Sequence, residues 1–405
     1  MIAVLAAACS RQPARDASVD LQISAAIAGI RAIDHHAHPV RPVTRGEAPD
    51  LEFDALPVES LEPASDPIRL RPMAAGFAEA SRELSNIDRS AQDYAVRVLD
   101  KIGAEKMFAN RVAMGPGLPP SRFVWVAYAD ALMYPLANDA LLVNSDRKAF
   151  FALEERLLKR YYAESRIAAR PASLEEYLSK VVRPTLERHK QGGAVAEKFE
   201  MAYLRSLAVG NPARAEAEKA WAGTGDYRAL QDFIFRFIAT ECGRLGMAVH
   251  FHTGAGAGGY FDETGASPML LEPLLNDPSL RKTNFVMVHG GWPSTSQVTA
   301  LLGKPTAYLD FSVQAFLTDS ADLGLSIRGW LEFVPEKVMF GTDAYPYSPE
   351  AGWEETAYVA SKAGREALGR ALTGMLRDGE ISQDRAAELA RMVLRDNARK
   401  LYGWH

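Results

Sequence analysis

The chain has 405 residues, of which 48% are apolar and 24% are charged, and its formal net charge is −5. This composition is typical of a globular protein and excludes a disordered chain or a long coiled coil. The slightly acidic charge balance gives no reason to expect nucleic acid or an anionic membrane as a partner. A small-molecule partner is therefore the expectation, and the sequence does not indicate an oligomeric state.

The N-terminus has the pattern of an exported protein. The apolar run 2–8 precedes Cys9, and the polar stretch 10–20 follows it. This resembles a bacterial lipoprotein leader with its lipid-anchoring cysteine, although the usual basic start is missing and the aliphatic Leu5 stands four positions before the cysteine. The run is shorter than the ~20 residues of a membrane-spanning helix. We expect residues 1–20 to be a leader and tether of a periplasmic or membrane-anchored protein; otherwise the protein is cytoplasmic.

Beyond the leader, helical patterns alternate with short apolar strands. A helix is expected at 21–30 and another at 91–102. The segment 39–90 between them is rich in Pro, Ser and acidic residues, which predicts a long loop insertion with short helical pieces. A second insertion at 133–171 is helical and charged, which predicts a solvated excursion. Strands are predicted at 31–36, 106–112, 123–128, 194–199, 247–252, 285–288, 307–311 and 337–340.

Several helix boundaries can be predicted from local signals. Ser173 and Glu176 form a capping-box pattern, and Pro184 should interrupt the helix that they open. Apolar residues recur every three or four positions from 230 to 245, and the next residue is a glycine that can end this helix. Cys242 lies on that apolar stripe, so it is expected to be a buried structural thiol. A last helix is predicted at about 382–402.

The alternation of eight predicted strands with helices indicates a parallel sheet covered by helices. Eight strands fit a distorted (β/α)8 TIM barrel over residues 21–405, with the two loop insertions and a C-terminal helix. A doubly wound open sheet is the alternative fold. No G-x-G-x-x-G or P-loop pattern follows the first strand, so a nucleotide site of that fold is not indicated.

His36 ends the first predicted strand, and His38 follows two positions later. Side chains alternate between the faces of a strand, so these two project to the same side, with Cα atoms about 6.6–6.8 Å apart. That spacing allows both imidazoles to bind one metal ion. An isolated H-x-H pattern also fits a polar turn after a strand, so its meaning depends on the rest of the chain.

Further residues that can bind metal stand at the ends of later strands, namely His250, His252, His289 and Asp343. In a barrel these ends converge on one mouth, where the loops build the active site. Nitrogen and oxygen ligands suit Zn²⁺ or a similar divalent ion that keeps one position for water. His250 lies one layer deeper than His252, so we expect it to pack behind the site. Taken singly, His289 also fits a buried core histidine, and Asp343 fits a helix cap.

This arrangement resembles the amidohydrolase superfamily, in its family-2 branch. The resemblance runs from about residue 31 to the C-terminal segment 396–402 and includes His36, His38, His252, His289 and Asp343. It implies that the H-x-H pair and Asp343 hold the ion, and that Asp343 takes the proton of metal-bound water. It also implies that His252 and His289 bind a second ion or orient the substrate. Asp343 and His289 are thus the candidate catalytic residues.

Lys198 ends the fourth predicted strand. Many two-metal members of the superfamily use a lysine there, carboxylated on its amine, as the bridging ligand. The segments 197–199 and 252–254 are similar to amidohydrolases fused to glutamine synthetase, so the resemblance implies a second ion bridged by carboxylated Lys198. Decarboxylase relatives in the same branch do not rely on such a lysine. From local sequence alone, a lysine reaching from the strand end to solvent is an equal alternative.

Together these features predict a metal-dependent hydrolase with one or two divalent ions, Zn²⁺ being the favoured one. A metal-bound hydroxide would cleave an amide, lactone or similar C–N or C–O bond of a small molecule. The alternatives are a metal-dependent decarboxylase of the same branch and a barrel that binds metal or ligand without turnover. Trp292, Tyr345 and Tyr347 are candidates for lining the pocket, and they do not identify the substrate.

Overall fold

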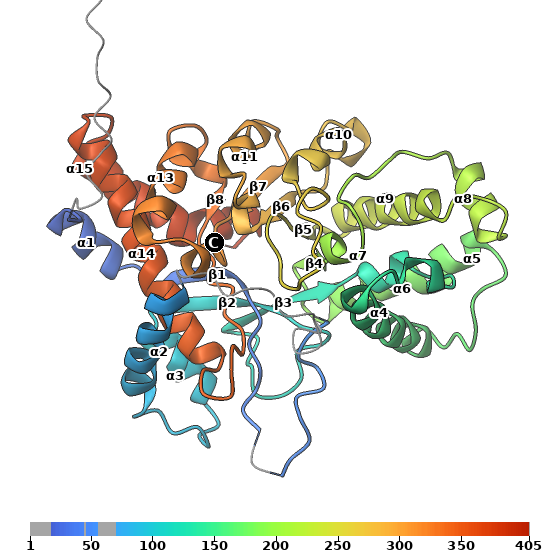
Figure 1. Cartoon of the computed structure of the whole chain (residues 1–405), viewed down its shortest axis with the longest axis horizontal. Helices are drawn as coiled ribbons and strands as arrows, with labels where there is room; N and C mark the ends of the chain where they lie inside the picture. Colours follow the sequence, from blue (N-terminus) through green and yellow to red (C-terminus); the bar gives the residue numbers. More distant parts are fainter. Residues whose placement is uncertain (1–17, 44–45, 56–69, 405) are drawn as a thin grey trace, which may run out of the picture.

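The computed structural model describes residues 18–43, 46–55 and 70–404 (Figure 1). Cys9 and most of the expected leader lie outside these described residues, so the predicted lipid anchor stays a prediction. No helix in the described part of the chain is long and apolar enough to cross a membrane.

One sheet of eight parallel strands forms the centre of the molecule, and the strands neighbour one another in chain order. The strands are β1 Ala32–Ala37, β2 Ala104–Asn110, β3 Phe123–Tyr128, β4 Ala196–Phe199, β5 Ala248–His252, β6 Phe285–Val288, β7 Ala307–Asp310 and β8 Val338–Met339. Backbone hydrogen bonds join β1 to the segment around β8, because His35 N donates to Phe340 O (2.9 Å) and Asp343 N donates to His36 O (2.7 Å). The sheet is therefore a nearly closed (β/α)8 barrel, and the predicted fold is confirmed.

The strands are apolar on both faces because side chains fill the barrel while helices cover its outside. Val286 and Val288 pack with Ile33 in one cluster, whereas Phe285 and Met287 belong to the larger cluster that includes the surrounding helices. This two-sided burial explains why continuous apolar runs predicted the strands. The predicted strands differ from the observed ones only in their ends.

Helices surround the barrel (Figure 1). The α-helices are α1 Leu21–Ala28, α2 Leu70–Leu84, α3 Tyr94–Lys101, α4 Ser145–Glu164, α5 Leu174–Tyr177, α6 Arg183–Gln191, α7 Met201–Leu204, α8 Arg214–Trp221, α9 Tyr227–Leu245, α10 Glu272–Leu275, α11 Thr295–Leu302, α12 Gln314–Leu317, α13 Ser320–Leu331, α14 Trp353–Arg377, α15 Gln383–Arg391 and α16 Asn397–Leu401. The sequence patterns did not predict the ends of the 25-residue helix α14.

The structure shows the predicted helix start, helix interruption and helix end. Ser173 accepts a hydrogen bond from Glu176 N (3.2 Å) at the start of α5. A π-helical turn at Leu178–Val182 separates α5 from α6, whose first turn contains Pro184. Gly246 ends α9 in the left-handed conformation, with φ of 64°, which glycine adopts without steric cost.

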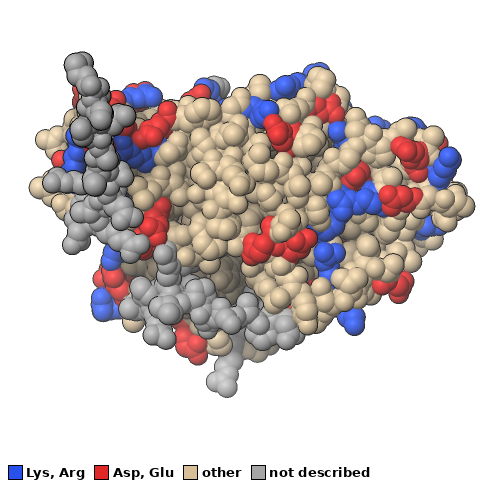
Figure 2. Space-filling view, turned by 45° about the horizontal axis from the view of Figure 1, so that its top comes forward, with Lys and Arg blue, Asp and Glu red and all other residues tan. Residues whose placement is uncertain are grey.

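The insertion at 133–171 differs from the prediction of a solvated excursion. Its helix α4 buries Phe150, Phe151, Leu157 and Tyr161 in the main hydrophobic cluster. The apolar side chains recur at helical spacing on one face, and that face packs inward while the charged face remains outside. Figure 1 shows α4 with α5, α6, α8 and α9 on one side of the barrel. On the face shown in Figure 2, uncharged residues cover much of the surface between scattered groups of charged side chains.

The C-terminal segment packs against the barrel. A π-helical turn at Met392–Asp396 joins α15 to α16, so the predicted last helix is one interrupted helix. Asn397 Nδ2 donates to Val338 O (2.8 Å) at β8. The rings of Tyr402 and Phe108 lie 4.8 Å apart, and Trp404 belongs to the same cluster. The tail is thus part of the barrel core.

Candidate metal centre

Three of the sequence-predicted ligands meet where β1 and β8 end. The Nε2 atoms of His36 and His38 lie 3.3 Å apart, and Asp343 Oδ1 lies 3.2 Å from the first and 3.4 Å from the second. The backbone bonds that close the barrel bring them together, since Asp343 N donates to His36 O and His38 N donates to Ala344 O (both 2.7 Å). Asp343 adopts φ of 57°, which turns its carboxylate toward the histidines.

These three distances fit a divalent cation of the size of Zn²⁺. Three atoms separated by 3.2–3.4 Å mark one face of a tetrahedron whose centre lies about 2.0 Å from each atom, the usual Zn–N and Zn–O distance. Two imidazole nitrogens and one carboxylate oxygen are also ligands that zinc prefers. The fourth corner of the tetrahedron is not taken by any of the three residues, which leaves room for water or substrate.

His289 and His252 stand beside this group. Ligand atoms of His36, His289 and Asp343 all lie within 4.8 Å of one another. His289 Nε2 in turn lies 3.1 Å from His252 Nδ1. His289 follows β6 with φ of 71°, and glycines at 290 and 291 continue this tight turn. The structure therefore brings the strand-five and strand-six histidines to the predicted rim.

Burial controls the charge of most of these imidazoles. It lowers the pKa of His36, His252 and His289 well below the usual value, and the nearby charge of Lys198 acts in the same direction. These rings are neutral at pH 7, so each has one nitrogen lone pair. Burial also opposes the charge of His38, but the carboxylates of Asp54 and Asp343 outweigh it and raise the pKa of His38 to about 10 in the metal-free chain.

Lys198 points into the interior and does not reach solvent. Its side chain is fully buried, and Nζ lies 2.5 Å from Oε1 of Glu200. Oε2 of Glu200 lies 3.6 Å from His252 Nδ1, so the ion pair adjoins the histidines. Burial raises the pKa of Glu200, although Lys198 opposes that shift. Lys198 therefore lies beside the candidate site, its role as a metal ligand stays a prediction, and its partner Glu200 was not foreseen.

His250 does not join the ligands. Its Nε2 lies 2.6 Å from the hydroxyl of Tyr402, inside the barrel and toward the C-terminal tail. This agrees with its expected place one layer below His252.

Several polar residues beside the ligands were missed by sequence reasoning. Each supports one of the histidines, and none belongs to a recognisable motif; they are Asp54, Asn110, Tyr128, Glu200, Asp310 and Ser312. Asn110 Nδ2, for example, lies 3.0 Å from His36 Nδ1 and donates to Ala37 O (2.9 Å). The only usable sequence signal was a polar residue at the end of an apolar strand, as at Asn110 and Asp310.

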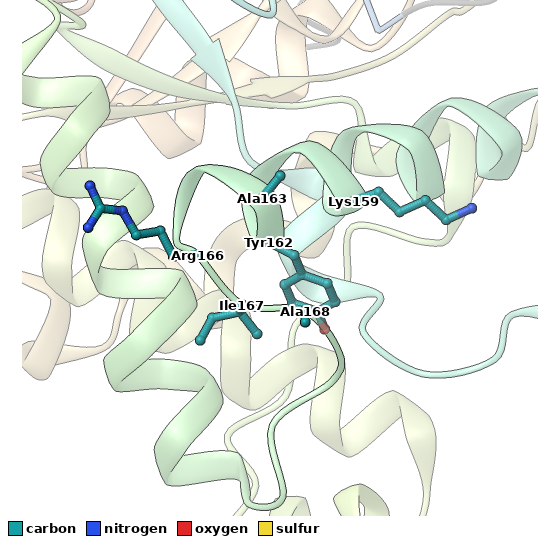
Figure 3. Close-up of a pocket in the computed structure, with 6 residues that line it drawn as sticks. All are labelled: Lys159, Tyr162, Ala163, Arg166, Ile167 and Ala168. Atoms are coloured by element: carbon teal, nitrogen blue, oxygen red, sulfur yellow. The ribbon is translucent and has the colours of Figure 1, made fainter.

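Aromatic side chains lie around the rim. The Tyr203 ring lies 4.7 Å from that of His252, and Tyr345 lies 6.0 Å from Tyr347. Trp292 lines a hollow of about 400 Å³ that also includes residues of α13. A separate hollow of about 460 Å³ at the end of α4 contains Lys159 and Arg166, whose side chains point away from one another in Figure 3. That second hollow gathers no set of catalytic groups.

Residues 204–404 match the family model Amidohydro_2, described as amidohydrolase. No curated protein sequence matches the chain. Among solved structures, the fold is similar to a protein from Lactobacillus casei described as a candidate metal-dependent hydrolase, with 15% identity, a TM-score of 0.66 and coverage of 95% of this chain and 98% of that one.

Two isomerases are also similar. They are a glucuronate isomerase from Caulobacter crescentus (12% identity, TM-score 0.57, 94% and 93% covered) and a uronate isomerase from Thermotoga maritima (12%, 0.58, 94% and 96%). At these identities the structural likeness shows a shared fold.

Proposed function

Because the chain belongs to the amidohydrolase family, we propose that it is a metal-dependent hydrolase acting on a small molecule. The bond cleaved is an amide, a lactone or a similar C–N or C–O bond. The observation that carries this proposal is the set of three ligand atoms from His36, His38 and Asp343, whose mutual distances of 3.2–3.4 Å fit one Zn²⁺ or a similar ion.

When bound, such an ion lowers the pKa of a water molecule to about 7 and polarises a substrate carbonyl. The protein then has to hold the substrate and move protons. Asp343 is the proposed acceptor of the proton of the attacking water, because its carboxylate lies beside the Nε2 atoms of His36 and His38 and its side chain is 12% exposed. The same carboxyl can return the proton to the leaving group.

We assign to His289 and His252 the role of orienting the substrate. Both rings are neutral, and they lie beside the three ligands without completing the same tetrahedral face. Tyr203 packs against His252 and supplies an apolar wall. A small molecule whose carbonyl lies near Asp343 would therefore contact His252, which ends β5, and His289, which follows β6.

We expect one ion in the resting protein. Glu200 lies against Lys198 and stabilises a positively charged amine, whereas a carboxylated lysine would place a second negative charge beside that carboxylate. The two-ion site with carboxylated Lys198, which the resemblance implied, is the alternative. It would use His252 and His289 as ligands of the second ion.

The first experiment measures metal content and activity together. Purified protein should contain about one divalent ion per chain, and His36→Ala should lose most of this metal and the activity. The matched control is His189→Gln, which removes a buried histidine that pairs with Glu197 (2.9 Å) away from the ligands. Undiminished metal in His36→Ala would refute the site.

The reaction class is tested with a panel of amides, lactones and esters. A hydrolase should release an acid and an amine or alcohol, and it should incorporate oxygen from labelled water. Release of one CO₂ per turnover from an acid substrate, with no hydrolysis of the panel, would identify the decarboxylase alternative. Metal retention without any turnover would favour the non-catalytic binding barrel.

A further inference from the structure

Asp310, at the end of β7, accepts hydrogen bonds on both of its carboxylate oxygens. Oδ1 receives the backbone N–H groups of His289 (3.2 Å) and Ser312 (3.0 Å), and the Ser312 hydroxyl lies 2.5 Å from it. Oδ2 lies 2.9 Å from His35 Nδ1. The side chain is fully buried. A carboxylate held by two backbone N–H groups acts as an acceptor, so each neighbouring side chain has to donate to it.

This constraint fixes the direction of hydrogen bonding toward the metal centre. The single hydroxyl proton of Ser312 points at Asp310, because two oxygen lone pairs could not face each other at 2.5 Å. Ser312 Oγ must then accept from His289 Nδ1, which lies 2.9 Å away. His289 therefore carries its proton on Nδ1, and its Nε2 lone pair faces the site. His252 Nδ1, at 3.1 Å, is left to donate to that lone pair.

A second arm runs from Asp310 to the C-terminal tail. His35 donates through Nδ1, so its Nε2 is an acceptor for the hydroxyl of Tyr402, 2.8 Å away. The Tyr402 oxygen then accepts from His250 Nε2 (2.6 Å). In this arm the side-chain atom left without a partner is His250 Nδ1, which is then an acceptor. Reversing this arm would instead bury an N–H group without an acceptor, which is the less favourable arrangement.

We propose that Asp310 is a positioning residue for the metal centre. Through Ser312 it sets the tautomer of His289, so that Nε2 carries the lone pair, which accepts from His252 Nδ1 in the metal-free chain and would pass to a metal ion or the substrate when one binds. The inference rests on the proposed function only for the use of that lone pair. The tautomer is a property of the chain itself and can be measured without metal or substrate.

The direct test is ¹⁵N NMR of the full, metal-free chain labelled at histidine. The chain has eight histidines, and the His289 signals are assigned by their loss in His289→Gln. The parent protein should show His289 protonated on Nδ1. Ser312→Ala removes the acceptor and should give a mixed or inverted tautomer. An Nε2-protonated His289 in the parent protein would overturn the proposal, even if Ser312→Ala failed to fold.

Two control variants separate this effect from a general disturbance. Tyr402→Phe removes the hydroxyl of the second arm and should change the His250 signals while leaving His289 protonated on Nδ1. Ser361→Ala removes another buried serine hydroxyl, which donates to Ile102 O (3.2 Å), and should leave all the site histidines unchanged. A change of His289 in Ser361→Ala equal to that in Ser312→Ala would also overturn the proposal.

Metal affinity gives an independent readout. Ser312→Ala should bind Zn²⁺ about 10- to 100-fold more weakly than the parent in a chelator competition, the usual effect of losing a partner behind a metal-binding histidine. Ser361→Ala should bind like the parent. An unchanged affinity in Ser312→Ala, together with an unchanged His289 tautomer, would refute the role of Asp310. Absence of hydrolase activity in the parent would bear on the proposed function and leave this inference standing.

Discussion

The carboxylate of Asp54 lies 2.6 Å from Nδ1 of His38, and both side chains are almost wholly buried. Asp54 accepts a hydrogen bond from Nδ1 and directs the Nε2 atom toward His36 and Asp343. The hydroxyl of Tyr128 donates to the other oxygen of Asp54 and holds it in place. A carboxylate behind a ligating histidine fixes the ring orientation and increases its basicity, so Asp54 supports the candidate metal centre from the loop before residue 56.

Asp54→Asn should weaken metal binding. The amide can no longer act as a charged acceptor for His38, and the loss of such a partner typically lowers metal affinity by about 10- to 100-fold. Competition with a chromophoric chelator measures the dissociation constant. Asp100→Asn, at a half-exposed surface position, is the control and should bind metal normally. Equal affinities for the two variants would show that Asp54 does not support the site.

The stability of the metal-free chain should decrease as the pH rises. Asp54 and Asp343 raise the pKa of His38 to about 10 against the opposing effect of burial, so the folded state binds a proton more tightly than the unfolded state, where the pKa is about 6.5. This contribution is complete below pH 6.5 and is lost between pH 6.5 and 10. Urea unfolding in the presence of a chelator measures the trend, and Asp54→Asn should flatten it. An equal pH dependence of the free energy of unfolding in the parent and in Asp54→Asn would show that Asp54 does not cause this pKa shift of His38.

The barrel and its rim could be predicted because they depend on local patterns. Apolar runs such as 285–288 are buried on both faces, and His36 and His38 share a face through strand alternation alone. The supporting residues could not be predicted in this way. Asp54 follows a loop without periodicity, and Asp310 meets His35 across 275 positions in the sequence. Such contacts arise only when the barrel closes.

The packing of α4 gives a prediction about stability. Phe151 is buried, and its ring meets that of Tyr134 at 5.0 Å, so Phe151→Ala should lower the free energy of unfolding by about 3–5 kcal/mol. Lys159→Ala on the exposed face of the same helix is the matched control and should change it by less than about 0.5 kcal/mol. Denaturant unfolding compares the two variants. A small effect at Phe151 would restore the view of α4 as a solvated excursion.

Export of the chain is a separate prediction from the sequence. We propose that the leader is removed before Cys9 and that this cysteine carries a lipid. Intact-mass analysis of protein from its native membrane fraction should then show an N-terminus at Cys9 with an added lipid mass. Cys9→Ser is the control and should abolish the modification. A native protein that retains Met1 and has no lipid would refute the proposal.

The final prediction concerns Lys198 and the number of ions. The Glu200 carboxylate lies 2.5 Å from the buried amine and would repel a carbamate there, so chelator-treated protein should take up one Zn²⁺ per chain whether or not bicarbonate is present. Removing Lys198 alone would leave a buried carboxylate unpaired and destabilise the fold. Lys198→Met combined with Glu200→Gln removes both charges together and is the better variant. It should fold and still bind one ion at His36, His38 and Asp343.

The two-ion alternative makes the opposite set of predictions, because a carboxylated lysine has to be formed from the neutral amine and CO₂. The second ion would then require bicarbonate, and labelled ¹³C-bicarbonate would give a carbamate signal in NMR. Lys198→Ala would lose the second ion and the activity, and a small added carboxylic acid would restore part of both. Metal stoichiometry with and without bicarbonate therefore decides between the two sites, and a bicarbonate-dependent second ion would show that the contact with Glu200 is broken when the site is loaded.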